Sequence, residues 1–454
     1  MRRLIPLVLL LLCAPARAAN DAPFEGSWWG LLDVGAVKLH VVFDLHHHGT
    51  AWSGTLASPD QNKANLPLGS VAVAGDTLTI EIPQLHVRFE GKRVDADHIR
   101  GTFTQGAPFP LTLQRGTPPS ARRPQEPKPP FPYASEDVTV ENRAAKLTLG
   151  CTLTHPHAPR FPVVVFITGS GQQDRDETLF GHKPFWVLAD ALARKGIGGL
   201  RCDDRGMGKS TGDFRASTTL DFAGDVAAEL AWLRARPDVD ARHLGLLGHS
   251  EGGLIAPIVA ARDHDVAFLV LLAGPGLRGD EILLKQQAMV ARSEGMSGAA
   301  LDESQALERK LITIVAGPDD AATARKKLDA IVAKRPPAAR ANLASQLDAM
   351  LSPWYREFLR TDPRPYLREV TAPVLALNGS RDVHVPSAES LAAIRAALAG
   401  NHDATVEELP GLNHLFQTCK RCTVDEYGDL EETMSPQAIT RVTDWVQKHA
   451  LTNR

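Results

Sequence analysis

The pattern of apolar and polar residues changes once along the 454-residue chain, near residue 133. Between residues 20 and 115, short segments such as Lys38–Leu45 alternate apolar with polar side chains, and glycine turns such as Gly49 and Gly91 separate them. Alternation with a period of two is typical of strands that bury one face and expose the other. Residues 20–115 are therefore predicted to form an antiparallel β domain.

Beyond residue 134 the period changes, because continuous apolar runs such as PVVVFI alternate with amphipathic helical segments. Strands that are apolar on both faces, with helices between them, indicate a mostly parallel sheet covered by helices on both sides. The α/β region is predicted to extend over residues 134–454. Within it, residues 278–367 show only helical patterns, which predicts a cap near the carboxyl edge of the sheet, where open α/β sheets bind ligands.

The two regions are joined by residues 116–133, GTPPSARRPQEPKPPFPY, in which proline occurs at nearly every second or third position. Such a run cannot enter the interior of a sheet and favours extended polyproline II geometry. It is predicted to be a semi-rigid linker.

The first 18 residues combine two arginines, an apolar stretch from Leu4 to Leu12 and the small-x-small triplet Ala16-Arg17-Ala18. This is the pattern of a cleavable secretory signal peptide, and the apolar stretch is too short to span a bilayer. No later apolar run reaches the length of a membrane helix. We therefore expect a periplasmic or secreted protein without a membrane span.

Composition and charge act mainly by exclusion. The formal net charge of −3 leaves no basic surplus to neutralise phosphates, so nucleic acid is not an expected partner. Four cysteines follow the leader, too few for a disulfide framework, and their pairing stays open: Cys151, Cys202, Cys419 and Cys422. The histidine run 46–48 is interpreted as a hairpin end rather than a metal site, because adjacent strand residues point to opposite faces.

The candidate nucleophile is Ser250, at the centre of the stretch GLLGHSEGG. The serine follows an apolar strand pattern and precedes a helical one, so it lies on a strand-to-helix turn. Such a turn is sharp, and the glycines Gly248 and Gly252 remove side chains that would clash there. The G-x-S-x-G pattern therefore predicts a nucleophile elbow.

An oxyanion hole is expected beside this elbow. The backbone N–H of Glu251 begins the following helix, and the second donor is expected from Ser170 or Gly171 in the loop TGSGQQDRDE. The stretch CDDRGMGKS lacks the G-x-x-x-x-G-K-[ST] spacing, so nucleotide binding is not expected. Its charged residues, Asp203, Asp204 and Arg205, are expected to brace the active-site loops.

A serine nucleophile needs a base and an orienting acid, which in this architecture follow in that chain order at strand ends. Asp382 lies just beyond the apolar run VLAL, and His414 lies just beyond the last predicted strand. They are the candidate acid and base. Less favoured alternatives are Asp403 and Glu408 for the acid, and His384 and His402 for the base.

From about Ser135 onward the chain resembles the α/β-hydrolase superfamily, and it is most similar to exported bacterial esterases and serine-aminopeptidase-like hydrolases with an amino-terminal β domain. The motifs TGSGQQDRDE, DDRGMGKSTGDF, GHSEGG, NGSRDVHVP and LNHLFQ carry this resemblance. It implies a covalent acyl-enzyme, no metal, no organic cofactor and a lipocalin-like β domain. The cysteine pair after His414 departs from the expected pattern.

These observations favour a carboxylesterase-type serine hydrolase (EC 3.1.1 class) acting on a small-molecule acyl ester. One alternative is a serine peptidase or aminopeptidase with the same triad, in which acidic cap residues capture the substrate amino terminus. Another is a non-catalytic ligand-binding protein on a hydrolase scaffold, which is disfavoured because all three triad residues are present. Aromatic residues of the cap are expected to line the acyl site or to pack the cap onto the sheet: Trp354, Tyr355 and Phe358. Neither the oligomeric state nor the acyl chain length is predicted.

Overall fold

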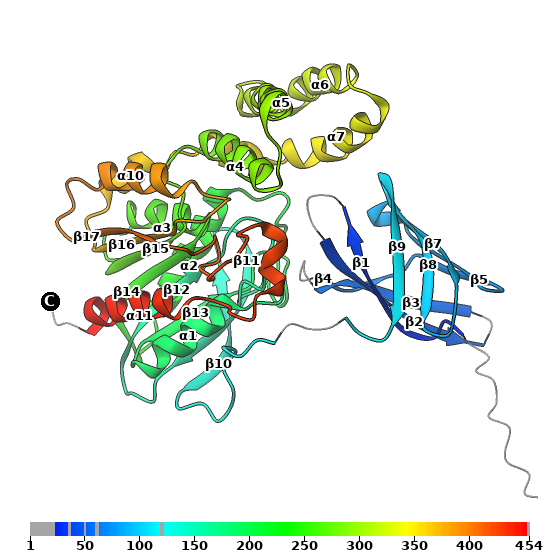
Figure 1. The fold of residues 1–454 in the computed structure, drawn as a ribbon. Helices are drawn as coiled ribbons and strands as arrows, with labels where there is room; N and C mark the ends of the chain where they lie inside the picture. Colours follow the sequence, from blue (N-terminus) through cyan, green and yellow to red (C-terminus); the bar gives the residue numbers. More distant parts are fainter. Residues whose placement is uncertain (1–22, 35–37, 50, 60–62, 119–121, 452–454) are drawn as a thin grey trace, which may run out of the picture.

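The computed structural model describes residues 23–451, apart from 35–37, 50, 60–62 and 119–121. The predicted signal peptide lies outside the described residues. Two sheets organise this part of the chain (Figure 1). None of its helices is long and apolar enough to cross a bilayer.

The first sheet is antiparallel throughout, with nine described strands in the order β4-β3-β2-β1-β9-β8-β7-β6-β5. Alternate residues of its strands are buried, and Trp28, Phe43 and Phe89 fill the core completely shielded from solvent. At the end of one hairpin the ring of His47 stacks on Trp52, with 4.6 Å between ring centroids. The strands are β1 (Gly26–Asp33), β2 (Lys38–His48), β3 (Ala51–Ser58), β4 (Lys63–Pro67), β5 (Ser70–Ala74), β6 (Thr77–Ile82), β7 (Val87–Arg93), β8 (His98–Gln105) and β9 (Ala107–Arg115).

The second sheet has eight described strands in the order β10-β11-β13-β12-β14-β15-β16-β17, and it is parallel from β13 onward. Its central strands are buried along their whole length, as continuous apolar runs predict. The strands are β10 (Ala134–Asn142), β11 (Leu147–His155), β12 (Phe161–Ile167), β13 (Gly198–Cys202), β14 (Val239–His249), β15 (Phe268–Leu272), β16 (Val374–Gly379) and β17 (Ala404–Leu409).

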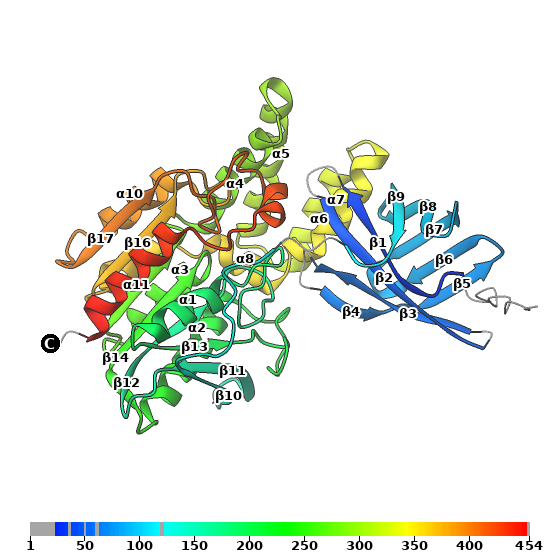
Figure 2. The same cartoon turned by 60° about the horizontal axis from the view of Figure 1, so that its bottom comes forward.

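Helices cover both faces of this sheet (Figure 2). One face packs against α2 (Thr219–Arg234), α3 (Gly252–Ala260), α9 (Pro363–Glu369) and α10 (Ser387–Ala397). The other face packs against α1 (Pro184–Arg194) and α11 (Pro436–Leu451). The predicted fold class, a mostly parallel α/β sheet preceded by an antiparallel β domain, is confirmed.

Further helices between β15 and β16 form the predicted cap and have their own apolar core, which includes Leu311, Val315 and Leu328. Of these, α4 and α8 lie nearest the carboxyl edge of the sheet, and α5 to α7 stand farther out (Figure 1). The cap helices are α4 (Gly279–Ser293), α5 (Gly298–Ala316), α6 (Ala321–Val332), α7 (Pro337–Met350) and α8 (Pro353–Arg360).

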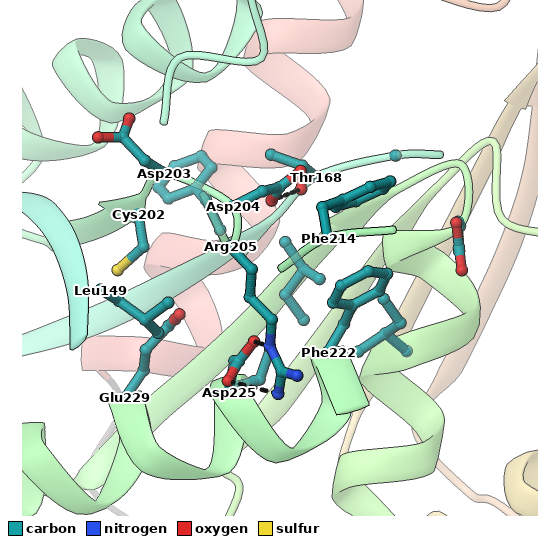
Figure 3. A pocket seen from close by; sticks show the side chains of 16 residues that line it. Leu149, Thr168, Cys202, Asp203, Asp204, Arg205, Phe214, Phe222, Asp225 and Glu229 are labelled. Atoms are coloured by element: carbon teal, nitrogen blue, oxygen red, sulfur yellow. Dashed lines mark hydrogen bonds and ion pairs between the residues drawn. The ribbon is translucent and has the colours of Figure 1, made fainter. Parts of the chain in front are cut away.

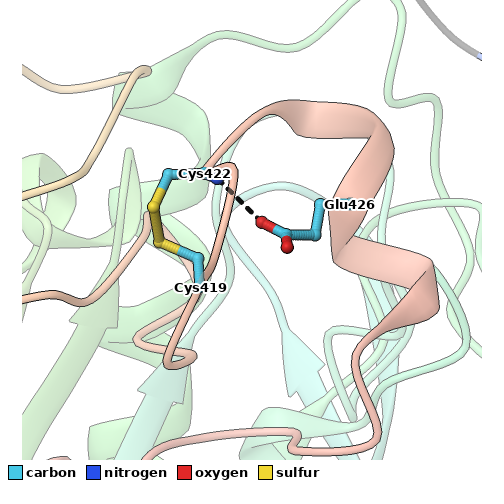
Figure 4. A group of neighbouring side chains, drawn as sticks. All are labelled: Cys419, Cys422 and Glu426. Carbon is cyan, nitrogen blue, oxygen red and sulfur yellow. Dashed lines mark hydrogen bonds between the residues drawn. A yellow bond between two sulfur atoms is a disulfide. The ribbon is translucent and has the colours of Figure 1, made fainter.

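The four described cysteines form two disulfides, a pairing that the sequence had left open. Cys151 and Cys202 are direct cross-strand partners in β11 and β13. Cys419 and Cys422 close a short loop after His414 (Figure 4). Because their sulfur atoms are bonded to each other, neither serves here as a thiolate ligand.

Candidate active site

The strand-to-helix turn at Ser250 has the geometry of a nucleophile elbow. Ser250 joins β14 to α3 with φ at +52°, in the left-handed region that non-glycine residues seldom adopt. A Cβ atom at Gly248 would lie 2.0 Å from the carbonyl oxygen of Gly252, and one at Gly252 would lie 2.1 Å from that of Ile167. Both neighbours are backbone atoms that cannot move aside, so the turn requires glycine at these two positions.

The candidate acid and base lie together. His414 Nδ1 is 2.8 Å from Asp382 Oδ2, and both side chains are buried. The second carboxylate oxygen accepts the backbone N–H groups of His384 at 2.7 Å and Val385 at 2.9 Å. Burial raises the pKa of Asp382, but the charge and hydrogen bond of His414 lower it further, so the net shift is downward. An ionised Asp382 accepts the proton on Nδ1 and leaves the other nitrogen of His414 free to act as a base.

The loop after β12 lies against the elbow. A Cβ atom at Gly169 would be 3.2 Å from Ser250 Cβ, so this loop's backbone passes directly beside the nucleophile. Of the two predicted second oxyanion donors, Ser170 lines the cavity that contains Ser250 and Glu251, whereas Gly171 is outside its lining. The geometry therefore favours Ser170 over Gly171.

The charged stretch after β13 holds this loop in place (Figure 3). Asp204 accepts the hydroxyl of Thr168 at 2.8 Å and the backbone N–H of Gln173 at 2.7 Å. Its neighbours form ion pairs, Asp203 with Arg175 and Arg205 with Asp225, each with a shortest N–O distance of 2.6 Å. Burial raises the pKa of Asp204 to about 8.

A cavity of about 290 Å³ contains the serine and the histidine. Its walls are mainly apolar and come from the cap, the loop after β12 and the segment after His414. All three cap aromatics that the sequence singled out line it: Trp354, Tyr355 and Phe358. The indole Nε1 of Trp354 donates to the Glu251 carboxyl at 2.9 Å, which ties α8 of the cap to the elbow.

The alternative acids and bases are not placed for catalysis. His384 lines the cavity, but its Nδ1 accepts from the Gln286 amide at 3.1 Å, and burial, helped by the charge of His414, lowers its pKa to about 3. It stays neutral and serves poorly as a base at neutral pH. The other three alternatives lie outside the cavity lining: His402, Asp403 and Glu408.

A buried pair that sequence reasoning missed connects the parts of the site. His249 Nδ1 is 2.9 Å from Glu177 Oε1, and its Nε2 is 3.0 Å from the carbonyl oxygen of His414. The same Glu177 oxygen accepts the backbone N–H of Gly169 at 2.8 Å. Burial lowers the pKa of His249, but the charge and hydrogen bond of Glu177 raise it more. Both residues occur in quoted motifs, but no spacing rule relates positions 72 residues apart.

The comparisons with known proteins agree with this architecture. Residues 185–418, just over half of the chain and including the three candidate triad residues, match the family described as serine aminopeptidase, S33. Esterase EstD of Thermotoga maritima is 24% identical over 287 residues, which are 63% of this chain and 61% of that protein. The aligned region therefore spans less than two thirds of the relative's length.

Two solved structures are similar at lower levels of identity. The Pyrococcus furiosus esterase Pf2001 has 14% identity and a TM-score of 0.43, covering 74% of this chain and all of that one. Est1E from Butyrivibrio proteoclasticus, solved with ferulic acid bound, has 17% identity and a TM-score of 0.40, covering 68% and 96%. With the family match, the elbow and the capped sheet, the conclusion is that this chain belongs to the serine aminopeptidase S33 family of α/β hydrolases.

Proposed function

We propose that this hydrolase cleaves carboxylic esters through Ser250, His414 and Asp382. The observation that carries the proposal is the 2.8 Å contact between His414 and Asp382 in the cavity that also contains the elbow serine. A serine hydroxyl becomes a competent nucleophile when an oriented imidazole accepts its proton.

The proposed reaction has two halves. His414 takes the proton of Ser250 as the hydroxyl oxygen attacks the acyl carbon, and the N–H groups of Glu251 and Ser170 stabilise the oxyanion. The carbon–oxygen bond to the alcohol then breaks, and His414 returns the proton to the departing alcohol. Water next gives a proton to His414 and attacks the acyl-enzyme, which releases the carboxylic acid and restores the serine.

The lining of the cavity supports an ester substrate over a peptide amino terminus. Among the described residues that form the lining, Glu251 alone has a carboxyl group, and it already accepts from Thr219 at 2.6 Å and from Trp354. The acidic cap residues considered for amine capture are elsewhere, because Asp280 pairs with Arg278 and Glu281 with Arg364. A buried ammonium group needs a partner charge, and this cavity has none to spare.

The volume of the cavity further supports a small acyl group. About 290 Å³ is at the lower end of the range for small-molecule sites, which is roughly 300–1,000 Å³. We therefore propose short acyl chains or a single aromatic ring as the acid part of the substrate.

The test uses the purified protein and its Ser250→Ala variant. Nitrophenyl esters of increasing acyl length are compared with aminoacyl and dipeptidyl nitroanilides. Ester hydrolysis that disappears in the variant, with anilides untouched, is the expected result. Anilide cleavage at comparable efficiency would establish a peptidase, and inactivity on both sets in a folded protein would establish a binding role.

We also propose that the chain is exported after cleavage of residues 1–18. Two disulfides in the described part of the chain support this, because they persist in oxidising compartments. Cell fractionation with mass analysis of the mature protein tests it, and an intact amino terminus in the cytoplasmic fraction would overturn it.

A further inference from the structure

One arginine of the proline-rich linker is fastened to two segments at the rim of the cavity. Arg123 donates from Nε to the carbonyl oxygen of Gly181 at 3.1 Å and from Nη1 to that of Leu430 at 2.8 Å. Its Nη2 donates to the carbonyl oxygens of Phe180 at 2.8 Å and Gly428 at 3.0 Å. Residues 180–181 and 428–430 are far apart in sequence, and this guanidinium group joins them.

A neighbouring glutamine adds a second attachment to the later segment. The side-chain oxygen of Gln125 accepts the backbone N–H groups of Thr433 at 2.6 Å and Met434 at 3.1 Å, and its amide donates to the Met434 carbonyl at 2.7 Å. The linker was predicted to be only a semi-rigid spacer. Residues 123–125 instead bind to the α/β region through backbone groups.

The two segments that Arg123 joins carry two aromatic walls of the cavity. Phe180 and Tyr427 both line it, and their rings meet edge to face with centroids 5.5 Å apart. Tyr427 lies in the short helix η3 (Val424–Asp429), between the disulfide loop and Leu430. Arg123 is itself outside the lining and contacts the backbone behind these rings.

Arginine is suited to this task for a chemical reason. Its planar guanidinium has five N–H donors in a rigid fork, so one side chain can satisfy several carbonyl groups at once. A lysine ammonium is a compact point charge on a flexible stem and cannot reproduce that geometry.

We propose that Arg123 is a positioning residue for substrate specificity: it clamps residues 180–181 to 428–430 and thereby sets the distance between the Phe180 and Tyr427 walls. The proposal rests on the ester hydrolase function proposed above. A loosened clamp makes the cavity less selective for acyl size without removing any catalytic group.

The test compares full-length Arg123→Met and Arg123→Lys with the matched control Arg122→Met, which changes an exposed arginine next in sequence. The measured quantity is the ratio of kcat/KM for the best and the worst acyl lengths in the nitrophenyl ester series. One methylene in an apolar pocket is worth roughly 10- to 200-fold in discrimination, so we expect this ratio to fall by about 5- to 10-fold in both Arg123 variants. The Arg122 variant should keep the ratio of the unchanged protein.

A second measurement does not depend on activity. Hydrogen exchange followed by mass spectrometry should accelerate in residues 177–183 and 424–434 of the Arg123 variants only. An unchanged chain-length profile with unchanged exchange would overturn the proposal, as would faster exchange spread over the whole α/β region. If the unchanged protein shows no ester hydrolysis that depends on Ser250, the proposed function fails, and the exchange result still decides whether Arg123 acts as a clamp.

Discussion

The buried pair of Glu177 and His249 offers a direct test of how the site is organised. Its contacts connect the loop after β12, the end of β14 and the backbone of the catalytic histidine. Glu177→Gln retains the shape of the side chain and removes its charge. We expect the oxyanion loop at Gly169 to lose its fixed position, while substrate binding in the apolar part of the cavity persists.

The size of the effect follows from the contacts. One Glu177 oxygen serves both Gly169 and His249, so the substitution disturbs the loop that supplies Ser170 without removing that donor. Loss of a whole oxyanion donor costs roughly 100- to 1,000-fold in kcat, and a displaced donor should cost less. We expect kcat to fall about 10- to 100-fold, which is about 1.4 to 2.8 kcal/mol of transition-state stabilisation, with KM changed little.

The assay is steady-state hydrolysis of a nitrophenyl ester, with the fraction of reactive serine titrated by a fluorophosphonate. Glu229→Gln is the matched control, because Glu229 is also a buried carboxyl group but lies outside the cavity of Ser250. Because the two residues act as one unit, the double variant with His249→Gln should lose little more than either single variant. Equal kcat in Glu177→Gln and the unchanged protein, or fully additive losses, would refute the reasoning.

Three further predictions concern the elbow, the cap and acid stability. Gly248→Ala should abolish fluorophosphonate labelling or soluble expression, because the new Cβ meets a backbone oxygen at 2.0 Å; normal labelling would contradict the geometry. Trp354→Phe keeps the stacking on Phe358 but loses the hydrogen bond to Glu251, so KM should rise for all esters while labelling of Ser250 persists. Burial lowers the pKa of His182 to about 4 from 6.5, so its contribution to stability is present above pH 6.5 and is lost as the pH falls towards 4. The loss is about 3 kcal/mol, and His182→Gln should flatten the corresponding fall in melting temperature between pH 7 and 4.5; an equal fall in both proteins would show that other groups cause it.

The local features of the site were accessible from the sequence because each has a local physical cause. A buried parallel strand must be apolar on both faces, and this requirement marked the strands that precede Ser250 and Asp382. The elbow requires glycine at residues 248 and 252 on steric grounds, so the serine between them stood out. Chain order and strand-end placement then indicated Asp382 and His414, which the structure brings into contact.

The tertiary structure alone decided which distant residues meet. Glu177 and His249 are 72 residues apart, and Arg123 bonds to carbonyl groups as far as 307 residues away. Every residue has the same carbonyl group, so a bond to the backbone leaves no side-chain pattern to detect in its partner. The pairing of the cysteines and the lining of the cavity have the same origin. The sequence by itself determined the fold class and the local chemistry, whereas chain packing over long separations decided the partners, because hydrophobic period and spacing specify which face is buried but not against what.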